Sequence, residues 1–413
     1  MMSKKSPQLR FEGFTDDWEE RKLSSGLREY TDRVIVEDDK EYYQISVRNN
    51  FGGITLRGSK MGNKIGRKRQ AKINLTKYPQ TLIFTRQTVE QGGIGWVDKY
   101  CDGAIVTENM PTISLDTSVF SKYFLTNLFQ TRIFYKNAIL DNIEGGSAQI
   151  AIHESKFLSS TLLFANLDEQ EKIGQFFKQL DDTIDLHQRK LDLLKEQKKG
   201  YLQKMFPKNG AKVPELRFAG FADDWEERKL GDIAPLRGGY AFKSSKFRNT
   251  GVPIVRISNI LSSGEVGGDF AYYDEQDKDD KYILPDKSAV LAMSGATTGK
   301  VSILSQTDYD KVYQNQRVGY FQSVDYIDYG FISTIVRSEL FMMQLESVLV
   351  SGAQPNVSSK EIDSFNFMIP ILVQEQQKIG SFFKQLDDTI ALHQRKLDLL
   401  KEQKKGFLQK MFV

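Results

Sequence analysis

The segment SGATTGKV at 294–301 has glycines, threonines and a lysine that could bind a phosphate group. A phosphate-binding P-loop requires four residues between its two glycines and a Ser or Thr directly after its lysine. Here three residues separate Gly295 from Gly299, and Val301 follows the lysine. The spacing therefore argues against a P-loop.

The other candidates for catalysis are weaker. GGIGW at 92–96 lacks the spaced glycines of a dinucleotide fingerprint, and no NPPY-like tetrapeptide of amino-methylating enzymes is present. His153 precedes a Glu and a Ser, but adjacency in sequence does not make a catalytic triad. One cysteine, Cys101, and three histidines cannot supply a disulfide or a structural zinc site. We expect a protein that is not an enzyme and needs no cofactor or metal.

The whole chain of 413 residues is nearly neutral, with 57 Lys and Arg against 54 Asp and Glu. This length is typical of two or three domains of ~100–200 residues each. No window approaches the ~18 apolar residues of a membrane span, and no apolar segment follows the basic N-terminus as in a secretion signal. We therefore expect a soluble, cytoplasmic protein.

Basic residues are concentrated between Tyr42 and Arg86, where 45 residues include ten of them and no acid. Such a local positive field suits a polyanion, so we predict that this segment contacts DNA. A solvated surface without a ligand is the alternative. The candidate DNA-binding residues here are Arg48, Arg57, Lys60, Lys64, Arg67, Lys68, Arg69, Lys72 and Arg86.

A second, milder basic segment extends from Ile233 to Gly264 and also lacks acids. It adds the candidates Lys243, Lys246, Arg248 and Arg256. The acidic stretch at 265–286 is more typical of a solvated loop than of a metal site. Runs such as PIVRISNI, AVLAM and QRVGYFQ predict strands separated by turns. We expect an α+β fold in which both such regions contain a substantial sheet.

Two segments of the chain occur twice. The residues at 7–23 return at 214–230 with 14 of 17 identical, and those at 170–206 return at 376–412 with 33 of 37 identical. The intervening inserts share only fragments such as GGSAQ and SGAQ. A repeated frame around unlike inserts suggests one mechanical role for the frame and two recognition roles for the inserts. A recent duplication with drifting inserts is the alternative.

The repeated segment 170–206 has a heptad pattern and no proline, which predicts a long helix. Its seam comprises Ile173, Phe177, Leu180, Ile184, Leu191, Leu194, Tyr201 and Met205, interrupted by His187 and Lys198. The second copy repeats this seam from Ile379 to Met411. Gly200 and Gly406 could either end the helices or lie within them.

Each seam side chain contributes about 1.5–3 kcal/mol when buried, so the helix requires a partner. We predict that the two copies pair antiparallel within one chain, because the linker at 207–213 can turn the chain between them. A parallel homodimer is the alternative. A two-fold axis relating the halves would place Phe412 near Pro7 and make the molecule effectively circular.

The predicted helices also have a second, smaller apolar stripe outside the seam. Leucines seven residues apart, in register on both copies, suggest a surface for helices of another protein. These candidates for partner binding are Leu186, Leu193, Leu392 and Leu399.

FTDDWEERKL, SGATTGKV, NQRV, SGAQPNVS and the long repeated helix together resemble the specificity subunit (HsdS) of Type I restriction-modification systems. The resemblance spans essentially the whole chain. It implies two globular mixed α/β DNA-recognition domains held apart by two long antiparallel helices, with pseudo-two-fold, circular organisation. Each domain would recognise one half of a split, asymmetric site on double-stranded DNA.

The resemblance further implies assembly with two adenine-methylating subunits (HsdM) and two translocase-restriction subunits (HsdR). The recognition domains would span 1–167 and 214–373, with spacer helices at 168–206 and 374–413. The pattern of the second insert adds the DNA-binding candidates Ser294, Thr297, Lys300, Asn315, Gln316, Arg317, Gln354 and Asn356. The first insert departs from that pattern, so its candidates rest on charge alone.

Two other functions remain open at this point. The chain could be a stand-alone DNA-modifying enzyme, which would turn over DNA and a methyl donor without a partner. It could also be a coiled-coil adaptor, which would show no salt-sensitive binding to DNA.

Overall fold

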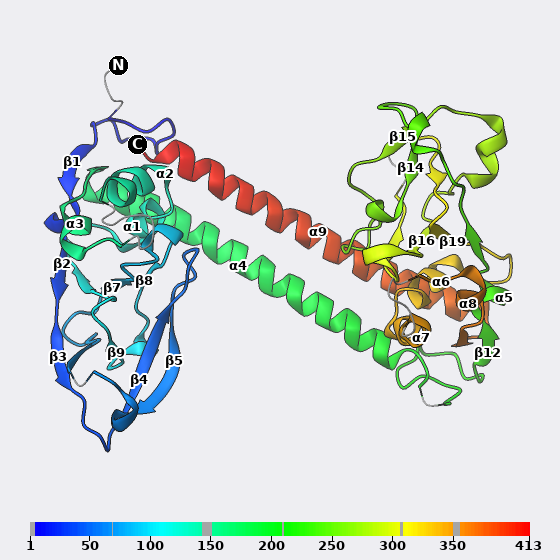
Figure 1. Ribbon diagram of the computed structural model, residues 1–413, viewed down its shortest axis with the longest axis horizontal. Helices are drawn as coiled ribbons and strands as arrows, with labels where there is room; N and C mark the ends of the chain where they lie inside the picture. Colours follow the sequence, from blue (N-terminus) through cyan, green and yellow to red (C-terminus); the bar gives the residue numbers. More distant parts are fainter. Residues whose placement is uncertain (1–4, 68, 143–150, 209, 306–308, 350–355) are drawn as a thin grey trace. The chain divides into compact units, whose positions relative to one another are not determined.

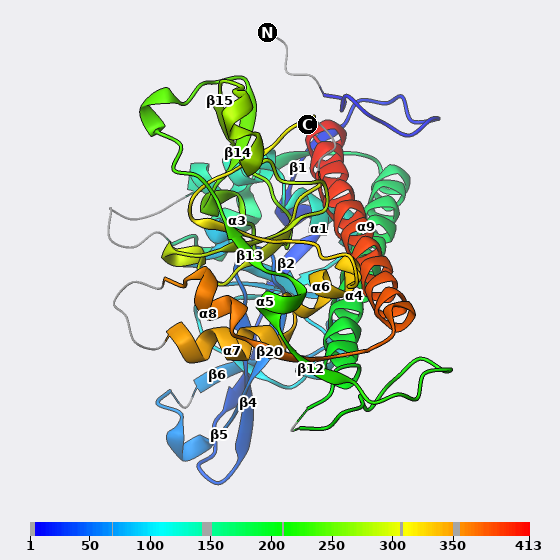
Figure 2. The same ribbon diagram turned by 90° about the vertical axis from the view of Figure 1, so that its right-hand side faces the viewer.

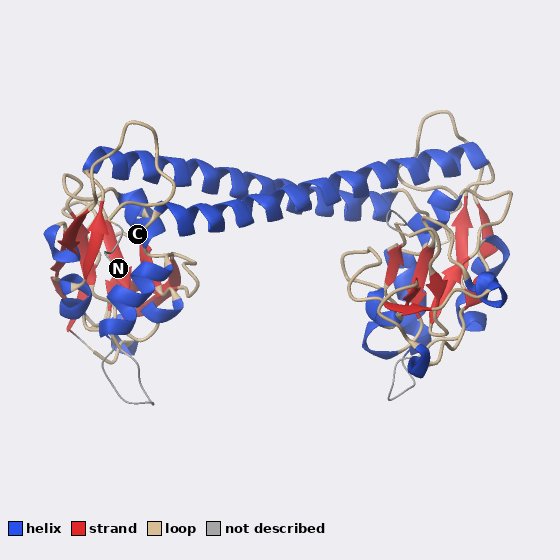
Figure 3. Ribbon diagram, turned by 90° about the horizontal axis from the view of Figure 1, so that it is seen from above, coloured by secondary structure: helices blue, strands red, loops and turns tan. Residues whose placement is uncertain are grey.

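The computed structural model describes residues 5–67, 69–142, 151–208, 210–305, 309–349 and 356–413. The chain forms two compact units. Unit 1 comprises Met1–Gln188 and Arg395–Val413, and unit 2 comprises Arg189–Gln394. Helices and strands are mixed in both units, which confirms the α+β prediction (Figures 1 and 3).

Two long helices, α4 (Leu167–Lys204) and α9 (Val373–Met411), each contribute one half to each unit. Most of their predicted seam is buried, with at most 2% exposure at Ile173, Phe177, Leu191, Ile379, Phe383, Leu397 and Met411. Other seam residues, such as Leu180, Ile184 and Tyr201, are partly buried. Both helices continue past Gly200 and Gly406. A Cβ added at either glycine would meet no atom within 4 Å, so packing does not require glycine there.

The helices pair antiparallel in both units. In unit 1 Phe176 packs against Phe407 with ring centroids 5.1 Å apart, and Asp181 forms an ion pair with Lys404 at 2.7 Å. Residue numbers thus rise on α4 as they fall on α9. Unit 2 repeats both contacts in the pairs Tyr201–Phe382 and Lys198–Asp387. The intrachain pairing is confirmed, rather than a parallel pairing of two chains.

The shorter repeat closes each unit onto these helices. Strand β1 (Glu19–Lys22) pairs with β11 (Thr161–Phe164), and β12 (Glu226–Lys229) pairs with β20 (Asn366–Ile369), in matching antiparallel registers.

The two ends of the chain meet in unit 1. The Leu9 N–H donates to the Lys410 carbonyl oxygen at 2.9 Å, and the Leu216 N–H donates to the Lys204 oxygen at 2.8 Å in unit 2. The chain ends therefore repeat the junction that the linker makes in unit 2. This geometry confirms the predicted circular organisation.

Unit 1 contains a four-stranded sheet and a five-stranded sheet. The first has the order β2 (Leu27–Tyr30), β10 (Thr112–Leu115), β7 (Thr81–Phe84) and β8 (Ile94–Trp96). The second has the order β3 (Asp32–Ile35), β6 (Arg69–Lys72), β9 (Ile105–Val106), β4 (Glu41–Val47) and β5 (Ile54–Met61). Its short α-helices are α1 (Lys122–Leu128), α2 (Arg132–Phe134) and α3 (Glu154–Ser159).

Unit 2 contains a four-stranded sheet and a three-stranded sheet. The first has the order β13 (Leu236–Gly238), β19 (Val318–Phe321), β16 (Ala289–Ala292) and β17 (Val301–Ile303). The second has the order β15 (Ala271–Tyr273), β14 (Val252–Val255) and β18 (Tyr313–Gln314). Its helices are α5 (Leu230–Ile233), α6 (Tyr329–Ile335), α7 (Glu339–Leu349) and α8 (Ser359–Asp363).

The two inserts share one strand topology although their sequences share only fragments. The order β2-β10-β7-β8 matches β13-β19-β16-β17, strand for strand along the chain. In the other sheet, β9-β4-β5 matches β18-β14-β15, with one parallel and one antiparallel pair in each. Among the described residues, β3 and β6, which pair with each other, are the strands of these sheets without a counterpart in unit 2.

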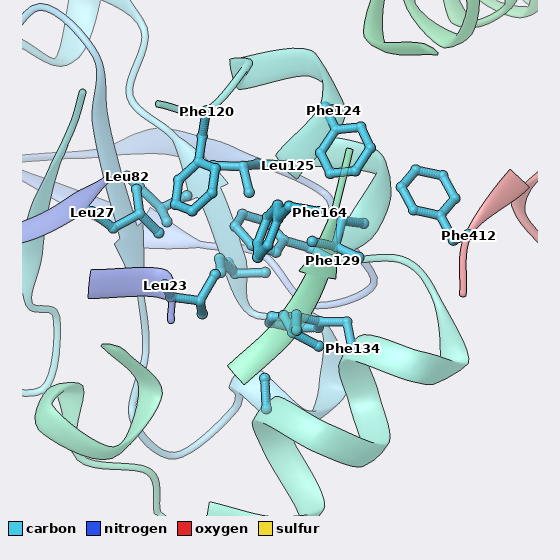
Figure 4. Packing of buried hydrophobic residues seen from close by; sticks show 14 of the residues in the cluster. Leu23, Leu27, Leu82, Phe120, Phe124, Leu125, Phe129, Phe134, Phe164 and Phe412 are labelled. Atoms are coloured by element: carbon cyan, nitrogen blue, oxygen red, sulfur yellow. The ribbon is translucent and has the colours of Figure 1, made fainter. Parts of the chain in front are cut away.

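Each unit also buries one aromatic cluster against the end of a long helix. In unit 1 the Phe412 ring faces that of Phe124 (Figure 4), with the ring centroids 5.2 Å apart. Both rings pack against Trp18. The corresponding cluster of unit 2 consists of Phe206, Phe331 and Trp225. The frame thus fixes each insert on its helix ends by matching contacts.

Candidate nucleic-acid interface

The SGATTGKV segment forms the connection between β16 and β17 in unit 2. Gly295 and Gly299 have φ values of 80° and 88°, which side chains with a Cβ rarely adopt. The Thr297 hydroxyl donates to the Ile257 carbonyl oxygen at 3.3 Å, and Lys300 Nζ donates to Ser262 Oγ at 2.7 Å. These bonds join this connection to the one between β14 and β15.

The NQRV and SGAQPNVS segments meet this connection at Met293. The Met293 N–H donates to the Arg317 carbonyl oxygen at 2.9 Å, and the Met293 oxygen accepts from Val357 N–H at 3.0 Å. Ser294 and Asn356 form an isolated antiparallel bridge beside them. Three segments that lie far apart in sequence therefore converge at one edge of the β16–β19 sheet.

The candidates from the resemblance differ in their accessibility. Gln316, Arg317 and Asn356 are exposed, whereas the others that the structure describes are partly buried: Ser294, Thr297, Lys300 and Asn315. Gln354 lies outside the described residues.

Only some of the basic candidates of unit 2 are free to contact DNA. Lys243 and Lys246 are exposed at η7 (Ser244–Lys246). Arg248 forms an ion pair with Asp274 at 3.3 Å. The Arg256 guanidinium donates to the Asp269 carbonyl oxygen at 3.0 Å, so it is engaged in holding its own connection.

In unit 1 the first part of the basic segment forms the extended hairpin of β4 and β5 (Figure 2). Arg57 and Lys60 lie on β5 at the edge of the five-stranded sheet, Arg48 precedes that strand, and Lys64 lies in η2 (Gly62–Lys64). All four are exposed and have no ion pair with another described residue. These four candidates of unit 1 are therefore accessible to a phosphate.

Three further candidates in unit 1 are paired with acids from outside the basic segment. Arg67 pairs with Glu108 at 2.8 Å, Lys72 with Asp32 at 3.8 Å, and Arg86 with Glu154 at 2.5 Å. Glu154 is only 7% exposed, so Arg86 has a structural role in neutralising it. Lys68 and the side chain of Arg69 lie outside the described residues.

Sequence reasoning missed the β7–β8 connection, residues 85–93, which is the topological counterpart of SGATTGKV. The two segments have no motif in common. Its Gly92 and Gly93 were considered only as part of a dinucleotide fingerprint, which they do not form. The strand order, rather than any sequence signal, identifies this segment as a functional candidate.

The four leucines of the second stripe are exposed, with fractions of 65% at Leu186, 51% at Leu193, 64% at Leu392 and 52% at Leu399. Within unit 1, the Asp181–Lys404 contact places Leu186 and Leu399 at about the same level of the helix pair. The Lys198–Asp387 contact does the same for Leu193 and Leu392 in unit 2. Each unit therefore presents a pair of exposed leucines, one from each helix.

Among the described residues, no helix is long and apolar enough to cross a membrane. That same part of the chain contains no cluster of three or more His, Cys, Asp or Glu residues able to hold a metal ion.

Solved structures of the same fold were found by comparison. The S subunit of a Type I restriction-modification system from M. genitalium matches with a TM-score of 0.63 at 14% identity, covering 99% of both chains. A chain of a structure on complex assembly and conformational transition of the type I R-M system matches with a TM-score of 0.52 at 15% identity, covering 96% of this chain and 97% of that one. At this identity they support the fold alone.

Two curated relatives match by sequence. The specificity subunit of the Type I restriction enzyme MjaVIII from Methanocaldococcus jannaschii is 26% identical over 59% of this chain. The specificity subunit of the Type I restriction enzyme EcoAI from Escherichia coli is 28% identical over 49% of it. The matches span 59% and 34% of the relatives' own lengths.

A family model, the Type I restriction modification DNA specificity domain, matches the chain twice, at 16–196 and at 222–402. The two matches reproduce the repeat that is visible in both sequence and fold. On this evidence the chain belongs to the family of Type I restriction-modification DNA specificity proteins.

Proposed function

We propose that this chain is the non-catalytic specificity subunit of a Type I restriction-modification complex. In this proposal it recognises an asymmetric bipartite site on double-stranded DNA through two recognition domains, at 1–167 and 214–373. The observation that carries the proposal is that one strand topology bears two unlike sets of connections. Connections of unlike sequence on a common scaffold suit two different half-sites.

The charge distribution supports contact with DNA in both recognition domains. Exposed basic residues without an acidic partner can neutralise phosphates, which position a protein on the duplex without specifying its sequence. Arg48, Arg57, Lys60 and Lys64 would have this role in unit 1, and Lys243 and Lys246 in unit 2. The polar side chains near Met293 are suited to contacts with base edges.

The partners of the chain are proposed from its family and from its exposed leucines. Two methyltransferase subunits and two restriction subunits would assemble with it in the cytoplasm. A pair of leucines on each unit offers helices of a methyltransferase subunit an apolar surface to pack against. The pseudo-symmetry of the pairs suits two copies of one partner.

Methylome mapping tests the proposal in a host that carries the gene and in a deletion strain. We expect one bipartite motif with two different halves to be methylated only in the host that carries the gene. Methylation by the purified chain without a partner would instead indicate a stand-alone enzyme. If DNA binding by the complex is absent or insensitive to salt, the chain is an adaptor.

A further inference from the structure

The tip loop, residues 48–53 between β4 and β5, has an unusual backbone. Asn50 and Phe51 have φ values of 54° and 56°, so two consecutive non-glycine residues are left-handed. This conformation costs roughly 1–2 kcal/mol per residue, and persists only where the surroundings enforce it. Lys287 is the only other such residue among those that the structure describes.

The hairpin turn closes with its own hydrogen bond, from the Gly52 N–H to the Asn49 carbonyl oxygen at 3.1 Å, and the β7–β8 connection adds further support to this conformation. The Asn50 N–H donates to the Gln91 carbonyl oxygen at 2.7 Å, and the Phe51 N–H donates to the Gly92 oxygen at 2.9 Å. A Cβ at Gly92 would lie 3.0 Å from Phe51 N, and Gly92 itself has a φ of 76°. Glycine at this position therefore allows the close approach of the tip loop.

A side-chain hydrogen bond completes the contact. Asn49 Nδ2 donates to Gln91 Oε1 at 2.7 Å, and both side chains are exposed. With that bond made, Asn49 Oδ1 keeps its capacity to accept a hydrogen bond and Gln91 Nε2 its capacity to donate one. Exposed Arg48 and Phe51, 42% exposed, flank this amide pair.

Unit 2 joins the same two connections by different bonds. There the β14–β15 and β16–β17 connections are linked through Thr297 to Ile257 and through Lys300 to Ser262. The amide pair of unit 1 thus occupies the same topological position as Thr297 and Lys300 of unit 2, which the family resemblance gives as DNA-binding candidates.

We propose that Asn49 and Gln91 form the base-recognition site of unit 1 and that it binds adenine in the major groove. Adenine presents the N6 amino group as a donor and N7 as an acceptor, the complement of the free Asn49 oxygen and Gln91 amino group. Arg48 is placed to contact a flanking guanine or phosphate. This inference rests on the proposed function and assigns the residues that carry it out in unit 1.

Substitutions in the assembled methyltransferase complex test the site. Methylation rates are compared over duplexes that carry each of the four bases at every position of both half-sites. Gln91→Ala should reduce discrimination at one adenine of one half-site by roughly 5- to 150-fold, the value of a bidentate contact. The other half-site should be unaffected.

Gln91→Glu separates recognition from loop structure. Its carboxylate can still accept the Asn49 hydrogen bond, but it replaces the donor that faces N7 with an acceptor. The preferred base at that position should change from adenine towards cytosine, which offers a donor at N4. A loop that had merely collapsed would lose discrimination without a new preference.

Two control substitutions test whether the change in base preference is specific to this site. Asn63→Ala removes an exposed amide of the same unit outside the site and should leave the base preference unchanged. Thr297→Ala should alter the other half-site only. The inference is wrong if the unaltered complex is sequence-specific while the Asn49→Ala and Gln91 variants keep every base preference. If the unaltered complex has no sequence preference, the proposed function itself fails.

Discussion

Units 1 and 2 share the main aromatic and ion-pair contacts of the frame and differ most in their inserts. The Trp18 and Phe412 rings lie 6.2 Å apart at 86°, and the Trp225 and Phe206 rings lie 6.1 Å apart at 87°. By contrast, the second sheet of unit 1 contains β3 and β6, which have no counterpart in the part of unit 2 that the structure describes. The comparison teaches that attachment and recognition are separable, because sequence change is concentrated in the inserts, outside the frame.

The largest predicted effect concerns the ion pairs that attach the shorter repeat to the long helices. Arg10 contacts both carboxylate oxygens of Glu169, at 2.6 and 2.7 Å, and Arg217 contacts both of Glu375, at 2.7 and 2.8 Å. Arg10→Met should lower the free energy of unfolding by about 3–5 kcal/mol, because it leaves a fully buried carboxylate without its cation. Urea unfolding measures this loss.

The corresponding substitution in unit 2 compares the two buried ion pairs directly. Arg217→Met should cost slightly less, because Glu375 also accepts from Trp225 Nε1 at 3.4 Å. The exposed Arg21 pair provides the control, and Arg21→Met should change stability by less than about 1 kcal/mol. Equal effects of Arg10→Met and Arg21→Met would show that the buried pair does not hold the frame.

Replacing glycines of the long helices by alanine should destabilise the protein at two positions and stabilise it at two others. A Cβ at Gly174 would lie 2.8 Å from Phe124 N, and one at Gly380 would lie 2.7 Å from Phe331 N, so backbone atoms would have to move. Gly174→Ala and Gly380→Ala should therefore destabilise by about 1–3 kcal/mol. Gly200→Ala and Gly406→Ala should stabilise by about 0.5–1 kcal/mol through helix propensity. Thermal unfolding distinguishes the two groups of variants. Stabilisation by all four substitutions would contradict the close packing of Gly174 and Gly380 against the neighbouring backbone.

The seam lysines have different surroundings in the two units. Asp387 pairs with both Lys198 and Arg337, whereas Lys404 contacts Asp181 and Gln130. Lys404→Met should thus cost about 1 kcal/mol more than Lys198→Met, since only Asp387 keeps a cation. Paired urea unfolding curves of the two variants measure the difference. Equal losses would mean that Arg337 does not compensate.

The dependence of stability on alkaline pH provides a second test of the surroundings of Lys198. Burial, and secondarily Arg337, lower the pKa of Lys198, although Asp387 opposes the shift. The unfolded chain therefore binds more protons than the folded chain at pH values between the lowered pKa and the ordinary lysine value of 10.5. The Lys198 contribution should raise stability as pH rises through this window. Lys198→Met should remove that rise.

The smallest predicted effect is on the salt dependence of DNA binding. Replacing Arg57 and Lys60 by Gln should reduce the slope of log affinity against log salt by about 2 if each contacts a phosphate. The acid-paired Arg67 and Lys72 form the control, and their replacement should change the slope by less than half as much. Fluorescence anisotropy of the complex on labelled duplexes measures the slopes. Equal slopes for all variants would exclude β5 from the interface.

The sequence was sufficient to predict the frame because its signals are local or repeated. The heptad seam predicted α4 and α9, and the repeat offsets predicted that the chain's two ends, at Pro7 and Phe412, would lie near each other. The nearby contact between Leu9 and Lys410 agrees with this prediction. Signals of this kind depend on spacing alone, which a single sequence displays in full. The family resemblance used the same repeats and was confirmed.

The recognition surfaces could not be predicted because their contacts join distant residues. Ten basic residues without an acid suggested a local positive field, yet acids far along the chain, such as Glu154 beside Arg86, neutralise part of it. The common topology of the inserts was hidden, since many sequences can form the same short strands. The contact between Asn49 and Gln91 spans 42 residues, and no local pattern marks it.

The most direct test replaces residues 24–167 by a second copy of 231–373 and maps methylation in a host that carries this chain with its partner subunits. Because the frame contacts match in both units, the transplanted insert should fold in place. We predict a methylated motif with two identical halves in inverted orientation, each equal to one half of the original site. Methylation that retains both original halves would contradict the claim that each unit recognises its own half-site.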